Sequence, residues 1–121
     1  MRYVELVNCG HVPPVVISGT EAHLIEESNL IVGLIPEATY AATQYRMRPG
    51  DRILLATDGI TEAENSMGEE FGDEGLKGIA RMTDLGAMMN RLAEFQATRE
   101  AQDDWTLVDV RYEGSAQHST Y

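Results

Sequence analysis

The stretch that decides the fold is residues 52–62, which have the sequence RILLATDGITE. Residues 52–57 are mostly apolar and follow a Pro-Gly turn signal, a pattern that is typical of a buried strand. Asp58 comes at the end of this strand, and Gly59 allows the chain to turn sharply after it. We therefore expect the Asp58 carboxylate to be exposed at the edge of a sheet, where it could hold a hard cation together with several waters. The alternative is an ordinary strand-ending turn, in which an Asp-Gly pair is common.

Strand and helix patterns continue on both sides of this stretch. The patterns predict further strands at residues 3–7, 15–17, 22–25, 30–35, 40–47 and 105–112. We expect the first two to form a hairpin across the turn residues 8–14. Helices are expected at residues 74–81 and 85–95, with Asp73 capping the first and Thr83 or Asp84 capping the second. The apolar face of the second helix, which includes its methionines, is predicted to belong to the core.

Composition limits the class of protein. The chain has 121 residues, 20 acidic against 9 Lys and Arg, a formal charge of −11 and one cysteine. This length favours a single domain, and the acidic charge argues against binding to nucleic acid. A phosphorylated substrate would be repelled unless divalent metal offset the charge. The sequence has no secretion signal and no stretch of ~18 apolar residues, which favours a cytoplasmic protein with no membrane span. A single cysteine cannot form a disulfide within the chain, which also favours the cytoplasm.

A second acidic feature is the pair Asp103-Asp104, just before the last expected strand. If that strand lies beside the one that ends at Asp58, the carboxylates come together as in magnesium or manganese sites with few protein ligands. The alternative is that the pair lies in a solvated loop. His11, in the loop between the first two expected strands, could line the same site. A nucleophilic role for Cys9 or a zinc site is disfavoured, because no ligand-like spacing of Cys and His surrounds it.

Five segments in order resemble one family. They are NCGHVPP (8–14), GLIP (33–36), PGDRILLATDGITEA (49–63), GEEFG (68–72) and DDWTLV (103–108). Over about residues 3–112 the chain is similar to the SpoIIE-type serine phosphatase domain, a relative of the metal-dependent Ser/Thr protein phosphatases. The family usually has Ala where this chain has Cys9.

The resemblance implies an α+β fold in which two antiparallel sheets are sandwiched by helices in an α-β-β-α arrangement. It also implies two Mn²⁺ or Mg²⁺ ions that activate a bridging water for attack on a phosphoserine phosphorus. On this sequence it makes Asp58 and Asp103 metal ligands, with Asp104 beside them. It places His11 at the catalytic centre. Gly59 and Glu62 would lie around the ligands.

One departure from the family pattern bears on activity. The family's early motif Asp-x-x-Gly-His-Gly, whose Asp bridges both metals, has no counterpart in this sequence. We therefore expect residues 1–112 to be the C-terminal part of such a domain, incomplete at its N-terminus and inactive as a fragment, with a tail at 113–121. The missing layers would leave an apolar face exposed, which predicts an interaction site or a homo-oligomer.

The resemblance implies a phosphatase that removes phosphate from a phosphoserine of a regulatory protein, such as an anti-sigma-factor antagonist. A non-catalytic interaction module that keeps the same fold is the alternative. A third reading is an unrelated acidic α+β domain, which would not place Asp58 and Asp103 on neighbouring strands.

Overall fold

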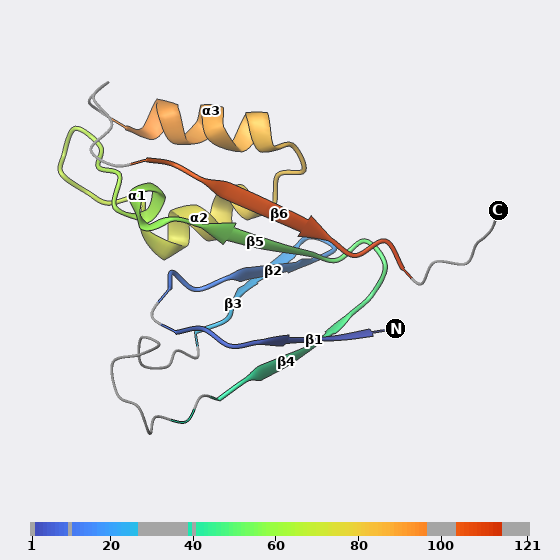
Figure 1. The fold of residues 1–121 in the computed structure, drawn as a ribbon. Coiled ribbons are helices and arrows are strands. Elements are labelled where there is room, and N and C mark those ends of the chain that lie inside the picture. The colour runs from blue at the N-terminus through green and yellow to red at the C-terminus, as the bar shows by residue number, and fades with distance from the viewer. Residues whose placement is uncertain (1, 10, 27–38, 40, 97–103, 115–121) are drawn as a thin grey trace.

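The computed structural model describes residues 2–9, 11–26, 39, 41–96 and 104–114, and it contains two antiparallel sheets (Figure 1). The two-stranded sheet pairs β1 (Arg2–Leu6) with β4 (Thr43–Met47). The four-stranded sheet has the order β3-β2-β5-β6, made of β3 (Glu21–Leu24), β2 (Val15–Ser18), β5 (Arg52–Ala56) and β6 (Leu107–Arg111). The helices of the described residues are α1 (Asp58–Thr61), α2 (Gly72–Ala80) and α3 (Leu85–Phe95). The expected α+β fold with antiparallel sheets is confirmed.

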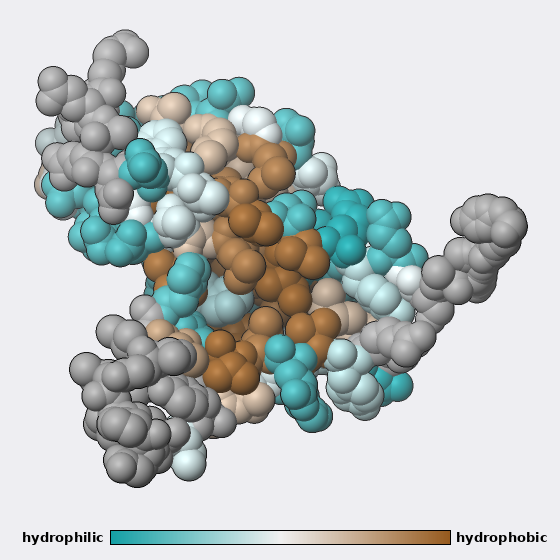
Figure 2. Space-filling view, viewed as in Figure 1, coloured by the Kyte–Doolittle hydropathy of each residue, from teal (hydrophilic) through white to brown (hydrophobic). Residues whose placement is uncertain are grey.

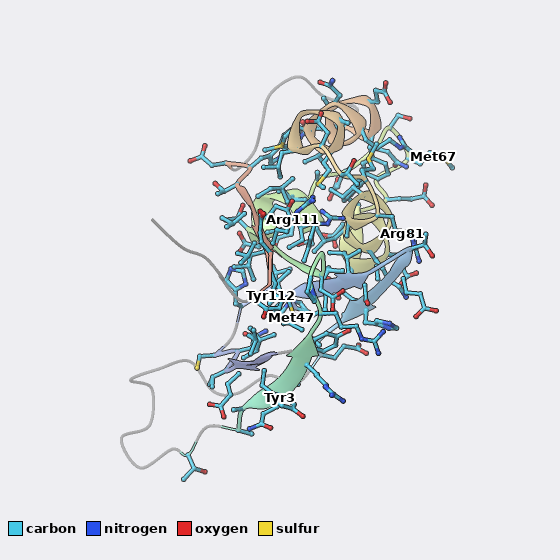
Figure 3. All side chains as sticks on the ribbon, turned by 90° about the vertical axis from the view of Figure 1, so that its right-hand side faces the viewer. Tyr3, Met47, Met67, Arg81, Arg111 and Tyr112 are labelled. Atoms are coloured by element: carbon cyan, nitrogen blue, oxygen red, sulfur yellow. The ribbon has the colours of Figure 1, made fainter. Side chains whose placement is uncertain are left out.

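The central strands β2 and β5 are buried on both faces, because successive side chains of a strand point to opposite sides. Val15 and Leu54 belong to the larger core, which lies between the four-stranded sheet and helices α2 and α3. Val16 and Ile53 point the other way, into a smaller core beneath the β1–β4 sheet. In this smaller core Met47 is buried, and Tyr112 lies near it (Figure 3). The described residues therefore form three layers: helices, four-stranded sheet and two-stranded sheet.

A buried arginine joins the sheet to the helical layer. The side chain of Arg52 is 4% exposed, and its Nη1 lies 3.3 Å from the Asp109 carboxylate on the neighbouring strand β6. Its Nη2 donates a hydrogen bond of 2.6 Å to the carbonyl of Ala80, the last residue of α2. The buried charge thus has an ion pair and a backbone acceptor, which offsets part of its desolvation cost.

The turn between β4 and β5 forms where the Pro-Gly signal predicts it. Gly50 has a φ of +94°, a value that a residue with a side chain rarely adopts. Asp51 closes the turn, because its Oδ2 accepts a hydrogen bond of 3.0 Å from the backbone N–H of Arg48.

The predicted hairpin of residues 3–7 and 15–17 is wrong. β1 pairs with β4, with Val4 opposite Tyr45, while β2 pairs with β3 on one side and β5 on the other. Both edges of β2 are therefore occupied, so β1 has no edge of β2 on which to pair. Residues 8–14 instead carry the chain from the two-stranded sheet to the four-stranded one.

The helices differ from prediction in two respects. The sequence predicts no helix directly after β5, but the chain there forms the single-turn helix α1. Asp73 does not cap α2: Phe71 is the N-cap, and Asp73 lies in the first turn, where a carboxylate still complements the helix dipole.

α3 agrees with the prediction. Its N-cap is Asp84, whose Oδ2 accepts a 2.9 Å hydrogen bond from the N–H of Ala87. Met88 and Leu92 of its apolar face are buried in the core, although Leu85 is 41% exposed. The strand expected at 30–35 lies outside the described residues. Among the described helices none has the length and apolar character needed to cross a bilayer.

Candidate active site

The site begins where β5 ends. Asp58 is the first residue of α1 and its side chain is exposed, as the sequence predicts, while Gly59 and Ile60 behind it are buried. Gly59 is not among the glycines with a positive φ, so the chain leaves the strand through a helical turn rather than the sharp turn expected. The buried pair anchors α1 to the core, and this fixes the backbone that carries the Asp58 carboxylate.

Thr57 fastens the end of β5 to the start of β6. Its Oγ1 donates a hydrogen bond of 3.3 Å to the carbonyl of Asp104 and accepts one of 3.0 Å from the N–H of Thr106. The backbone N–H of Thr57 also donates to the carbonyl of Thr106, at 3.1 Å. The segment that begins at Asp104 is therefore held one residue away from Asp58. β5, which is followed by Thr57 and Asp58, pairs with β6, the strand that follows Asp104, so the two strands are neighbours as expected.

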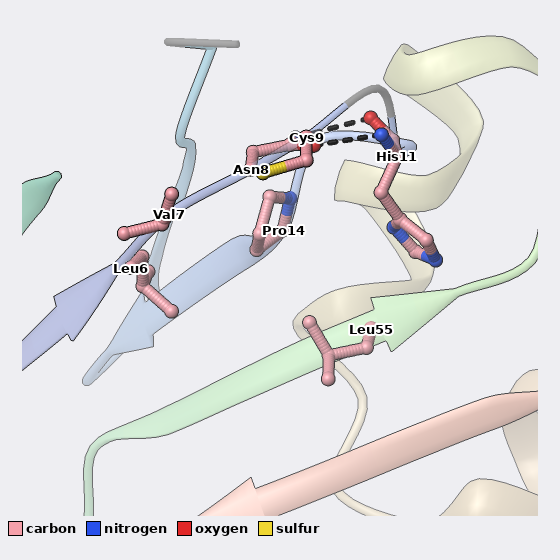
Figure 4. Close-up of a pocket in the computed structure, with 7 residues that line it drawn as sticks. All are labelled: Leu6, Val7, Asn8, Cys9, His11, Pro14 and Leu55. Atoms are coloured by element: carbon pink, nitrogen blue, oxygen red, sulfur yellow. Dashed lines mark hydrogen bonds between the residues drawn. The ribbon is translucent and has the colours of Figure 1, made fainter. Parts of the chain in front are cut away.

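The loop after β1 is shaped by a buried asparagine. Asn8 Oδ1 accepts a hydrogen bond of 2.7 Å from the N–H of His11, and Asn8 Nδ2 donates one of 3.0 Å to the carbonyl of His11 (Figure 4). The His11 ring is exposed, and its Nδ1 lies 2.8 Å from the carbonyl of Val12. Because a carbonyl can only accept, this contact places a proton on Nδ1 and leaves Nε2 as the nitrogen that can meet a ligand.

These segments meet at a surface hollow of about 210 Å³, which is lined by His11, Val12, Thr57 and Asp58. The predicted site residues His11 and Asp58 lie far apart in the sequence, and both line this cavity. A second hollow of about 180 Å³ is also lined by His11 and includes Cys9 in a mainly apolar lining (Figure 4).

None of the other predicted site residues that the structure describes lines this hollow. Asp103 lies outside the described residues. Asp104 is exposed at the start of the segment that leads into β6, and Glu62 is the exposed C-cap residue of α1. Within the described ranges no group of three or more His, Cys, Asp or Glu side chains is arranged to hold a metal ion. The described residues thus offer one carboxylate, Asp58, beside His11, and they do not by themselves make up a ligand set for two Mn²⁺ or Mg²⁺ ions.

Comparison with known proteins identifies the family. The family model of Stage II sporulation protein E (SpoIIE) matches residues 1–113. The chain belongs to the SpoIIE family. It is also similar to Protein IcfG of Synechocystis sp., with 31% identity over 75 residues that make up 60% of this chain and 12% of that protein.

Solved structures of phosphatase domains share the fold. The SiaA-PP2C domain of Pseudomonas aeruginosa has a TM-score of 0.69 and 22% identity, over 84% of this chain and 44% of that one. The PP2C phosphatase domain of SpoIIE from Bacillus subtilis, with a fragment of its regulatory domain, has a TM-score of 0.75 and 21% identity, over 91% of this chain and 34% of that one. The chain thus has the fold of part of a PP2C-type phosphatase domain, and it spans less than half the length of these relatives.

Sequence reasoning gave no role to Asn8 or Thr57, although both shape the site. Each stands directly beside or within a motif that was recognised, but their hydrogen bonds depend on where the loop and the neighbouring strand lie. One sequence pattern could have indicated the role of Thr57. It is a hydroxyl residue at the end of a buried strand, where its side chain can hydrogen-bond the backbone of the neighbouring strand.

Proposed function

We propose that residues 1–112 are the C-terminal part of a metal-dependent protein serine phosphatase domain and that 113–121 form a tail. In this proposal Asp58 and Asp103 are ligands of Mn²⁺ or Mg²⁺, and Asp104 is a neighbouring ligand. The observation that carries it is the hollow in which Asp58 lies beside His11, at the point where Thr57 joins β5 to the segment leading into β6. Membership in the SpoIIE family supports the same assignment.

In the phosphatases to which this family is related, bound metal activates water and neutralises charge on the phosphoryl group. This chain's own residues have simpler tasks. Asp58 and Asp103 contribute negative oxygen ligands, which hard divalent cations prefer. His11 lines the hollow, and with its proton on Nδ1 its Nε2 can accept a hydrogen bond from a water. Gly59 within α1 and Glu62 at its C-terminal end lie near the proposed ligand Asp58, the first residue of the same helix.

The substrate class that we propose is a phosphoserine on a regulatory protein, such as an anti-sigma-factor antagonist. One similar solved structure is described as the RsbU and RsbW domains of Rv1364c from Mycobacterium tuberculosis, with 20% identity and a TM-score of 0.66. The net charge of −11 repels a phosphate group. This charge supports recognition of the phosphoprotein through bound divalent metal, rather than through side chains alone.

A second candidate function is a non-catalytic interaction module with the same fold. It is favoured by the observation that the described ranges hold no group of three metal-ligating side chains. The two candidates differ in whether this chain binds metal at Asp58, so metal affinity is the property to measure.

The test is titration of the purified chain with Mn²⁺ by isothermal calorimetry, with hydrolysis of p-nitrophenyl phosphate measured in parallel. We expect Asp58→Asn and Asp103→Asn each to weaken Mn²⁺ binding at least tenfold, and the matched control Asp73→Asn on α2 to leave it unchanged. Slow hydrolysis is expected, because one chain supplies only part of the ligand set. Equal Mn²⁺ affinity in all four proteins, or rapid Mn²⁺-dependent hydrolysis that survives Asp103→Asn, would contradict the proposal.

A further inference from the structure

Thr57 is the residue at which β5 ends and α1 begins, and its backbone serves both elements. β5 pairs with β6 up to Ala56 and Leu107, so Thr57 and Thr106 are the next residues of the ladder. The N–H of Thr57 donates to the carbonyl of Thr106, as in a hydrogen-bonded antiparallel pair. The carbonyl of Thr57 instead accepts from the N–H of Ile60 at 3.1 Å, in the first turn of α1. The carbonyl that would complete the pair with Thr106 has therefore left the ladder.

The Thr57 hydroxyl takes the place of that carbonyl. Its Oγ1 accepts the hydrogen bond of 3.0 Å from the N–H of Thr106 and donates its own proton to the carbonyl of Asp104 at 3.3 Å. A threonine at the N-cap of a helix ordinarily caps that helix with its hydroxyl, but within the described residues the Thr57 side chain makes no such bond to α1. A hydroxyl has one proton, and Thr57 gives it to Asp104, so Thr57 does not donate to a ligand in the hollow that it lines.

The junction of β5 and α1 lies in a polar part of the surface. Asp58, Asp104 and Thr106 are all exposed. Figure 2 shows hydrophobic surface over the middle of the molecule and mainly hydrophilic surface at the left, where β5 runs into α1 in Figure 1. Water competes for the backbone groups of such a strand end, and exposed backbone hydrogen bonds open most easily. The two hydroxyl bonds therefore hold a part of the ladder that backbone pairing alone leaves weak.

We propose that Thr57 is a positioning residue of the candidate site, whose hydroxyl couples the backbone that carries Asp58 to the backbone that carries Asp104. Through its carbonyl Thr57 begins the helix whose first residue is Asp58, and through its hydroxyl it holds the carbonyl of Asp104. The backbones under the two carboxylates keep their separation only while these bonds persist. The coupling follows from the hydrogen bonds alone, whereas its effect on Mn²⁺ binding rests on the proposed function, in which both carboxylates are ligands.

Two substitutions separate the hydroxyl of Thr57 from the shape of its side chain. Thr57→Val keeps the branched side chain and removes both hydroxyl bonds, whereas Thr57→Ser keeps the hydroxyl and removes only a methyl group. The matched control is Thr61→Val, which makes the same change within α1, where the Thr61 hydroxyl donates to the carbonyl of Asp58 rather than to the segment leading into β6. Circular dichroism shows whether each variant is folded.

The first experiment needs no metal, because the chain's one tryptophan lies in the coupled segment. Trp105 stands between Asp104 and Thr106 and packs against the larger core. We expect Thr57→Val to raise the amide hydrogen-exchange rate of Thr106, measured by NMR, roughly fivefold or more, the factor that one hydrogen bond contributes. Trp105 fluorescence should shift to the red and be quenched more strongly by acrylamide. Thr57→Ser and Thr61→Val should match the unmodified chain in both measurements.

The second experiment measures the Mn²⁺ affinity of the unmodified chain and of the two Thr57 variants by calorimetry. Thr57→Val should weaken binding about 10- to 100-fold, the usual effect of removing a group that holds a metal ligand in place, and Thr57→Ser should retain it.

Two results would overturn the positioning role. One is a Thr57→Val chain whose Thr106 exchange and Trp105 quenching are unchanged, or are changed equally by Thr61→Val. The other is a loosened segment in Thr57→Val with Mn²⁺ affinity equal to that of the unmodified chain. An unmodified chain that binds no Mn²⁺ contradicts the proposed function instead, and the metal-free measurements then still decide whether Thr57 couples the two backbones.

Discussion

The two glycines of α2 should respond in opposite ways to the same substitution. Gly75 and Gly78 both lie inside the helix, where replacement of glycine by alanine ordinarily stabilises by about 1 kcal/mol. At Gly78 an added Cβ meets nothing within 4 Å, so the full gain is expected. At Gly75 it would lie 2.7 Å from Cγ of Phe71 and 2.8 Å from both Cδ atoms. Phe71 is buried and packs edge-on against Phe95 at 5.1 Å between ring centroids, so the ring cannot move aside freely.

Overpacking of this kind costs about 1–3 kcal/mol, so Gly75→Ala should be neutral or destabilising by up to about 2 kcal/mol after the helix gain is counted. Gly78→Ala and Gly75→Ala should therefore differ by about 2 kcal/mol, or roughly 8 °C in Tm for a chain of this size. Urea unfolding followed by circular dichroism at one protein concentration measures the difference. In a Phe71→Ala background it should largely disappear, because the ring is absent. If Gly75→Ala proves as stabilising as Gly78→Ala, the proposed contact between Phe71 and α2 is refuted.

Three further predictions concern stability. Asp84→Ala removes the side-chain cap of α3 from the N–H of Ala87 and should cost about 1 kcal/mol in urea unfolding, whereas Asp84→Asn should cost less. Tyr112→Phe should be neutral or stabilising by up to about 1 kcal/mol, because within the described residues the buried Tyr112 hydroxyl has no hydrogen-bond partner; a clear loss in Tm would contradict this. Arg52→Lys should destabilise by about 1–3 kcal/mol, because one ammonium cannot replace the guanidinium that reaches both Asp109 and the carbonyl ending α2; an unchanged unfolding midpoint would argue against that role.

Sequence patterns located the elements whose signals are local. β5 and α3 appear where apolar periodicity places them, and Asp84 caps α3 because a polar residue before an apolar helical face is a short-range signal. The single turn of α1 was missed, since four residues are too few to show a helical period. The partner of β1 was also missed. Strand pairing depends on which edges remain free after the whole sheet has formed, and residues near β1 in sequence carry no information about β4.

Local motifs also predict part of the candidate site. They point to Asp58 and His11, and the structure brings both to one hollow. The Thr57 hydroxyl joins segments 47 residues apart in sequence, a contact that depends on the pairing of β5 with β6. A local sequence pattern cannot predict a contact between residues so far apart in the chain. The position of Asp103, which lies outside the described residues, remains a prediction from sequence.

The pairing of β5 with β6 has a consequence for how the chain folds. Residues 57–106, which include all three described helices, lie between two strands that are neighbours in the sheet. Closing so long a loop costs conformational entropy before the ladder can form, and non-local pairings of this kind slow folding. During that interval β5, a largely apolar strand, has an edge that β6 has not yet covered. The rate at which α2 and α3 dock therefore governs how long the newly made chain is exposed to aggregation, which favours slow expression at low temperature when the protein is produced.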